Sequence, residues 1–240
     1  MSIDYPSPLY QRLRWHILGT LPPATRRILV QCSPWREGIV RFKETEIPQF
    51  QKHQSIFVHI PKTSGISVSK SLFNCTSPHV PMIDYEAIFS QPELDRMFKF
   101  AFVRNPWDRA VSTYSFLAGR TGIERDIAWA DRVLVNYTGF DDFIQRWLNR
   151  RNIYSWGLFF PQFFFVCNSQ QEIRVDFLGR FENLNADFEY IKHRLGISAE
   201  LLHLNKSKSR TDYRDYYTEK TRRIVADVYR EDVELFGYQF

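Results

Sequence analysis

The sequence predicts an α/β fold in which a central parallel sheet is flanked by helices, as a single domain with an N-terminal extension. Two apolar segments of strand length, 55–60 and 98–103, each lead through a loop into a segment with helical character. Repeated strand–loop–helix units favour parallel strands covered by helices. We therefore expect residues 51–240 to form the domain. Residues 1–50, with several prolines and weak periodicity, are expected to form a partly helical extension.

The first strand–helix unit is interrupted at Pro61 and Gly65, and its helix is expected to run from 66 to 73. In the second unit, Asn105 is a good helix cap and Pro106 suits the first helical position. Asp108 then places an acid in the first turn, where the helix dipole favours it. This helix is expected to continue to about residue 117.

The rest of the chain carries weaker signals. A helix is expected around 141–149, and further strands at 163–166 and 175–179. Residues 184–195 show apolar positions on one helical face. Thr218 is a candidate cap for a last helix. The apolar stripe expected on that last helix consists of Ile224, Val228 and Leu235.

Composition and charge exclude several functional classes. The net charge is +5, which suits an anionic ligand, but no recognised nucleic-acid module is present and no nucleic-acid partner is expected. The cysteines Cys32, Cys75 and Cys167 lie far apart, which argues against a disulfide framework and a zinc site. No apolar run approaches the roughly 20 residues of a membrane helix, so we expect no transmembrane segment. Asp4 and Arg12 interrupt any signal-peptide core, and a cytoplasmic protein is expected.

The loop after the first strand carries the groups that bind phosphate. A helix start presents backbone N–H groups and partial positive charge, and a phosphate satisfies both. Gly65 lets the backbone approach a ligand, Lys62 adds a cation, and Thr63, Ser64 and Ser67 add hydroxyl groups. The lysine precedes the glycine, unlike the order G-x-x-x-x-G-K-[ST] of nucleotide triphosphatases. With no obvious magnesium acid, the loop indicates a phosphate site without a metal, although an ordinary capped turn would have the same residues.

A second anion-binding group follows the second strand. Arg104 lies directly after the strand, and Ser112 lies two turns into the following helix. Because the carboxyl ends of parallel strands open onto one crevice, we expect both motifs to face the same ligand. An arginine fork matches phosphate geometry better than a lysine does.

These two motifs resemble those of the carbohydrate (Golgi-type, family 2) sulfotransferases, such as the heparan sulfate 2-O- and the chondroitin and HNK-1 sulfotransferases. Residues 58–65 resemble their 5′-phosphosulfate loop, and residues 102–112 their 3′-phosphate motif. Further similarity lies in 179–184, 203–207 and 232–238, so that the resemblance covers about residues 55–240.

The resemblance implies a P-loop-like fold and 3′-phosphoadenosine 5′-phosphosulfate (PAPS) as the donor. It implies adenosine 3′,5′-bisphosphate as the product, no metal, and a hydroxyl acceptor of the carbohydrate or glycoconjugate class. Arg104 and Ser112 would hold the 3′-phosphate. Ser207 and Arg210 would close over the nucleotide, with a solvated basic loop as an equal alternative. The 5′-phosphosulfate would be held by Lys62, Thr63, Ser64, Gly65, Ile66 and Ser67.

Two residues are the candidates for catalysis. Lys62 would stabilise charge on the departing 5′-phosphate. His79 lies between the first helix and the second strand, where the family's catalytic histidine occurs, and would act as the base for the acceptor hydroxyl. Glu182 is a second candidate, although an acid at a helix start is its simpler interpretation. The aromatic stretch 156–165 could line an acceptor cleft, but core packing is the preferred interpretation.

Two other functions remain open from the sequence. A P-loop nucleotide kinase or other phosphotransferase would need the G-K-[ST] order and a magnesium acid. A non-catalytic module that binds nucleotides or glycans would keep the anion-binding residues without the chemistry. The acceptor is expected to be selected by the regions 1–50 and 119–170.

Overall fold

The computed structural model describes residues 21, 25, 47–202, 204 and 211–240. These residues belong to two compact units. The first described below contains residues from 21–103 and 162–204 and holds the sheet. The second contains residues from 104–161 and 211–240 and is helical.

The described part of the sheet unit contains three parallel strands in the order β1-β2-β3. These are β1 (Ser55–Val58), β2 (Phe98–Val103) and β3 (Phe177–Arg180). Val58 of β1 pairs with Ala101 of β2, so the carboxyl ends of both strands lie at the same edge of the sheet. The predicted α/β fold with a parallel sheet is confirmed, and the strand expected at 175–179 is β3.

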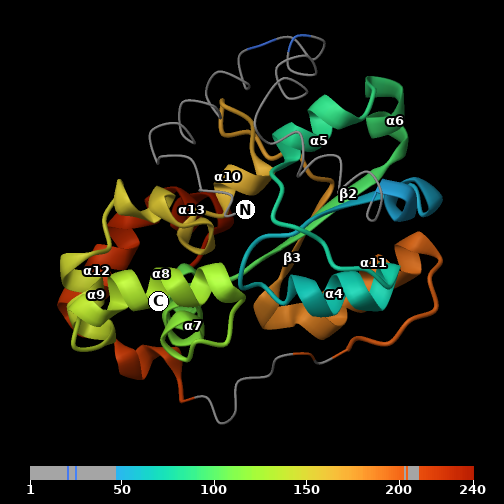
Figure 1. The fold of residues 1–240 in the computed structure, drawn as a ribbon. Helices are drawn as coiled ribbons and strands as arrows, with labels where there is room; N and C mark the ends of the chain where they lie inside the picture. The colour runs from blue at the N-terminus through green and yellow to red at the C-terminus, as the bar shows by residue number, and fades with distance from the viewer. Residues whose placement is uncertain (1–20, 22–24, 26–46, 203, 205–210) are drawn as a thin grey trace. The chain divides into compact units, whose positions relative to one another are not determined.

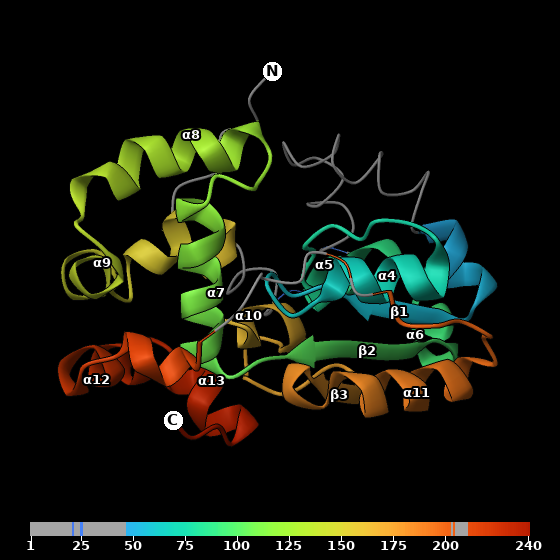
Figure 2. The same ribbon diagram turned by 90° about the horizontal axis from the view of Figure 1, so that it is seen from below.

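Helices cover both faces of this sheet. Figures 1 and 2 show α4 and α11 on one face, and α5 and α6 on the other. The helices are α4 (Gly65–Phe73), α5 (Met82–Ile88), α6 (Gln91–Arg96), α10 (Phe163–Val166), η4 (Phe181–Asn183) and α11 (Leu184–Leu195). Residues 47–52 are also helical.

Aromatic packing fixes the position of the strands. The rings of Phe57 and Phe100 stack at 5.1 Å between centroids across the β1–β2 pair, and both are fully buried. A Cβ at Gly179 would lie 2.6 Å from the ring of Phe102, so only glycine fits beside this ring. Burying each such side chain stabilises the fold by about 2–3 kcal/mol.

The prediction of a strand at 163–166 is wrong, because these residues form the short helix α10. All four side chains are buried, so the segment has neither the alternation of a half-exposed strand nor a helical stripe. A short apolar run of this kind fits a buried strand and a buried helix equally. The next residue, Cys167, makes an isolated antiparallel bridge with Ile173.

The helical unit is built around α7, the helix that follows Arg104. Its elements are α7 (Pro106–Ala118), α8 (Glu124–Val133), η1 (Leu134–Asn136), α9 (Phe140–Arg146), η2 (Asn152–Ser155), η3 (Gly157–Phe159), η5 (Tyr213–Tyr216), α12 (Glu219–Val228) and α13 (Arg230–Phe236). The helix expected at 141–149 corresponds to α9. No helix in the described part of the chain has both the length and the apolar composition needed to span a bilayer.

The end of the chain differs in part from the prediction. Thr218 caps α12 as expected, since its side chain accepts a hydrogen bond from the N–H of Thr221. The helix then breaks at Tyr229, whose hydroxyl donates to the carbonyl of Phe159, and α13 begins. The break changes the helical register. After the break Phe236 is buried and the predicted Leu235 is 37% exposed. Before the break the predicted Val228 is buried, but Val225 is buried in place of the predicted Ile224, which is half-buried.

Candidate functional site

The loop between β1 and α4 has the backbone of an anion-binding turn. Lys62 and Ser64 both adopt left-handed conformations, with φ angles of 68° and 67°. Such angles cost free energy in residues other than glycine and persist where the surrounding structure holds them. Left-handed residues in a turn direct successive N–H groups into one concavity, which binds anions. The loop therefore combines this geometry with the positive end of α4.

In the described part of the chain, the start of α4 lacks a side-chain cap. Ser64 is the residue before the helix, and among the described residues its side chain makes no capping hydrogen bond. The N–H groups of the first helical turn, from Gly65 to Ser67, have no acceptor within the helix. Ile66 is 40% exposed in this turn. Polar groups suited to a phosphate are therefore gathered at this end of the helix.

Two predicted hydroxyl groups are engaged with the protein. Thr63 is buried, and its hydroxyl donates to the carbonyl of Ile60 at 2.9 Å. The Ser67 hydroxyl accepts from the N–H of Leu204 at 3.2 Å. Leu202 donates in the same way to Ser71, one turn further along α4. Thr63 thus braces the loop internally, and Ser67 holds the chain at Leu204. Ser207 and Arg210, predicted to close over the nucleotide, lie outside the described residues.

Gly65 is required by close packing at the start of α4. A Cβ at this position would lie 1.9 Å from Cδ2 and 2.2 Å from Nε2 of His59. His59 is only 3% exposed. The sequence predicts that Gly65 lets the backbone come close to a ligand. The structure adds that the absence of a side chain at Gly65 makes room for the His59 imidazole.

His79 lies against the same imidazole. The two histidine rings are 4.2 Å apart between centroids. Nδ1 of His79 lies 3.1 Å from the backbone carbonyl of His59, and a carbonyl can only accept, so Nδ1 carries the proton. In the neutral ring Nε2 is then the basic nitrogen. The structure therefore places the predicted base beside the strand that leads into the Lys62 loop.

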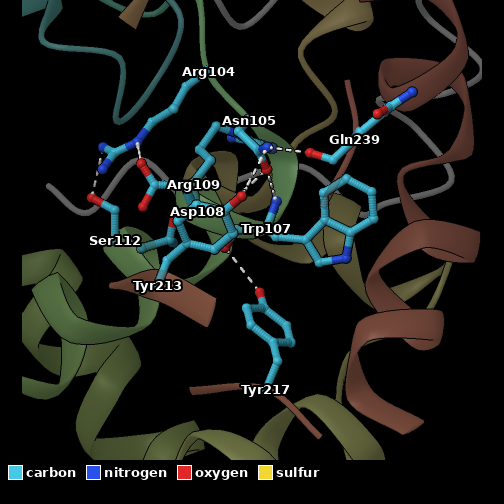
Figure 3. A network of polar contacts seen from close by, with 10 residues as sticks. Arg104, Asn105, Trp107, Asp108, Arg109, Ser112, Tyr213, Tyr217 and Gln239 are labelled. Atoms are coloured by element: carbon cyan, nitrogen blue, oxygen red, sulfur yellow. Dashed lines mark hydrogen bonds and ion pairs between the residues drawn. The ribbon is translucent and has the colours of Figure 1, made fainter. Parts of the chain in front are cut away.

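In the helical unit, Arg104 is held by two side chains of α7 (Figure 3). Its Nε donates to Asp108 Oδ2 at 2.8 Å, and its Nη1 donates to Ser112 Oγ at 3.1 Å. The Arg104 side chain is 4% exposed. A hydroxyl that accepts from arginine keeps its own proton for donation, so Ser112 can still bond a phosphate oxygen. The predicted pair Arg104 and Ser112 is thus in direct contact.

The start of α7 is fixed by a polar network (Figure 3). The side-chain oxygen of Asn105 accepts from the N–H of Trp107 at 3.0 Å, and its amide donates to the carbonyl of Gln239 at 2.8 Å. The same amide donates to the Tyr213 hydroxyl, while the Tyr217 hydroxyl donates to the carbonyl of Trp107. These bonds fix Asn105, the residue directly after Arg104. They therefore limit the positions that the Arg104 side chain can take.

Sequence reasoning missed the roles of Asp108 and His59. Asp108 was interpreted only as a first-turn acid, although its spacing of four residues from Arg104 is a signal for an ion pair along a helix. His59 was expected to pack or to orient the loop, without a named partner. Glu182 is exposed in the first turn of η4. The aromatic stretch 156–165 is largely buried, in agreement with core packing.

The fold and the loop after β1 define the general class of the protein. It is an α/β protein with a parallel sheet, a fold in which ligands bind beyond the carboxyl ends of the strands. Comparison with family models identifies it further: the model described as the sulfotransferase family matches residues 46–239, which is most of the chain. The chain belongs to the sulfotransferase family. Neither the curated proteins nor the solved structures give a match.

Proposed function

We propose that the protein transfers the sulfuryl group of PAPS to a hydroxyl group of a carbohydrate acceptor. The observation that carries this proposal is the Lys62–Ser64 turn, in which two left-handed residues, one of them the lysine, precede an uncapped helix start. Membership of the sulfotransferase family supports sulfuryl transfer as the use of this turn. The carbohydrate acceptor rests on the resemblance to the heparan sulfate 2-O- and the chondroitin and HNK-1 enzymes.

The residues present fit the two ends of the donor. The turn and the first N–H groups of α4 suit the 5′-phosphosulfate, because they offer a cation and backbone donors. Arg104 suits the 3′-phosphate, since Asp108 and Ser112 already orient its guanidinium. β1 and β2 are neighbouring parallel strands, and each leads into one of these motifs. We propose that both motifs bind one donor molecule.

PAPS supplies an activated sulfuryl group when it is bound. The acceptor oxygen forms a bond to sulfur, the bond from sulfur to the 5′-phosphate oxygen breaks, and the acceptor proton passes to His79. The ammonium group of Lys62 then offsets the charge that develops on the departing phosphate. The His79 bond to the His59 carbonyl leaves Nε2 as the nitrogen that accepts the proton.

The direct test of this function uses ³⁵S-labelled PAPS and a panel of glycan, glycolipid and small hydroxylated acceptors. Transfer of label to a carbohydrate is expected, and it should be unaffected by EDTA. Uptake of adenosine 3′,5′-bisphosphate without transfer to any acceptor would indicate a binding module instead. Transfer of phosphate from ATP that requires magnesium would indicate a phosphotransferase.

Replacing His79 with alanine is expected to lower kcat by about 10²–10⁴-fold, the usual contribution of a general base. The affinity for adenosine 3′,5′-bisphosphate should change little, because the base contacts the acceptor. The acidic limb of the pH–rate profile should also disappear, since it reports the protonation of the base. Retention of both kcat and that limb would show that another group accepts the proton.

Replacing Arg104 with lysine is expected to weaken adenosine 3′,5′-bisphosphate binding by about 10–100-fold, because a lysine cannot reproduce the guanidinium fork. Affinity for 5′-AMP, which lacks the 3′-phosphate, should hardly change. The matched control is Arg146→Lys, which alters an exposed ion pair with Asp142. Equal losses of affinity for both nucleotides would show that Arg104 does not bind the 3′-phosphate.

A further inference from the structure

His59 makes contacts in two directions. Its Nδ1 donates to the carbonyl of Ser77 at 2.5 Å, and its own carbonyl accepts from Nδ1 of His79. The segment 77–79 is thus tied to residue 59 at both ends. Because His59 follows β1 directly in the chain, these two bonds connect the segment that carries His79 to the end of that strand.

The other side of the His59 ring contacts the end of the loop between β1 and α4, which carries Lys62 and is called the donor loop below. The ring occupies the space that a side chain at Gly65 would need, and it stacks at 5.7 Å between centroids on Phe57 of β1. With the ring enclosed in this way, a shift of the imidazole would disturb both the start of α4 and the Ser77 bond. The placement of His79 and that of the donor loop therefore depend on the same buried side chain.

The His59 imidazole does not itself take the acceptor proton. Burial lowers the pKa of His59 to about 4, while its hydrogen bond to the Ser77 carbonyl acts in the opposite direction. The ring therefore stays neutral at pH values near 7. It is also almost entirely enclosed, at 3% exposure, so an acceptor hydroxyl does not reach it. A role in which it holds other groups fits these facts.

We infer that His59 is a positioning residue that holds His79 at the distance from the donor loop at which in-line transfer occurs. This inference rests on the proposed function, because it needs His79 to act as the base. The two bonds of the 77–79 segment and the contact with Gly65 carry it. Catalysis is sensitive to such placement, because a displacement of about 1 Å can cost roughly 10²-fold in rate.

Two substitutions separate the hydrogen bond from the packing. His59→Leu keeps an apolar group of similar size but removes the donor to Ser77. His59→Asn keeps a donor near the position of Nδ1 and removes the outer part of the ring. We expect His59→Leu to lower kcat by at least about tenfold, by displacement of the base. The dissociation constant for adenosine 3′,5′-bisphosphate should change by less than about threefold, and His59→Asn should recover much of kcat.

The decisive measurement repeats the substitution in a His79→Ala background. If His59 acts through His79, His59→Leu should lower kcat no further there, because residues that act as a unit are not additive. Full additivity of the two losses would overturn the inference, and so would an unchanged kcat in His59→Leu. Should the leucine variant fail to fold, as judged by circular dichroism, His59→Gln replaces it, since its amide lies beyond the position of Nδ1.

The same experiment distinguishes this inference from the proposed function. Normal turnover in His79→Ala would overturn the assignment of the base and the inference with it. Loss of kcat in His79→Ala combined with additive loss in His59→Leu would overturn the inference alone. An absence of adenosine 3′,5′-bisphosphate binding in the parent protein would contradict the donor site, and with it both proposals.

Discussion

Gly65→Ala is expected to weaken adenosine 3′,5′-bisphosphate binding by at least about 100-fold, because the loop must move away from its anion-binding shape. The added Cβ would lie 1.9 Å from the His59 ring, which is far too close for two non-bonded carbon atoms. His59 is enclosed and bonded to Ser77, so the start of α4 has to shift instead. Overpacking of this kind also lowers the free energy of unfolding by about 1–3 kcal/mol.

The matched control for this change is Gly139→Ala. A Cβ at Gly139 would meet no atom within 4 Å, and the backbone there is extended with φ of 171°. Calorimetric titration and thermal unfolding of both variants therefore separate the clash at residue 65 from a general effect of losing glycine. Binding by Gly65→Ala that equals the binding by the control would contradict the packing described for this loop.

Lys62→Ala is expected to lower kcat by about 10²–10³-fold, the usual cost of removing one group that stabilises developing charge. Because Lys62 already has a left-handed backbone, truncation beyond Cβ leaves the turn and its N–H groups in place. The dissociation constant of the donor should therefore rise far less than kcat falls. Initial rates over a range of PAPS concentrations give the two effects separately.

Lys70→Ala is the control for Lys62, since Lys70 is an exposed lysine in the last turn of the same helix. Its kcat and KM should match those of the parent protein. A Lys62→Ala protein with a raised KM and normal kcat would show that Lys62 binds the donor without stabilising the transition state.

The elements that could be predicted are those with local signals. The sequence Asn105-Pro106 followed by Asp108 marks the start of α7, and the side chain of Asn105 caps it as expected. The strand 98–103 agrees with β2 because its apolar residues are bounded by clear changes in pattern. Arg104 and Ser112 were expected to bind the same phosphate, and the structure places their side chains in direct contact.

The features that could not be predicted depend on contacts between distant residues. The break at Tyr229 accompanies a hydrogen bond to Phe159, which no local pattern announces. The left-handed angles at Lys62 and Ser64 occur in residue types that rarely adopt them. The close fit of His59 against Gly65, and its bond to Ser77, join loops that are separate in the sequence. Such contacts are visible only in the folded chain.

The central proposal is that one adenosine nucleotide binds with its 5′ end at the Lys62 turn and its 3′-phosphate at Arg104. Calorimetric titration of the parent protein with adenosine 3′,5′-bisphosphate and with 5′-AMP tests it most directly. We predict one site, with the bisphosphate bound at least about tenfold more tightly, which corresponds to about 1.4 kcal/mol. No measurable uptake of the bisphosphate, or equal affinity for the two nucleotides, would contradict the proposal.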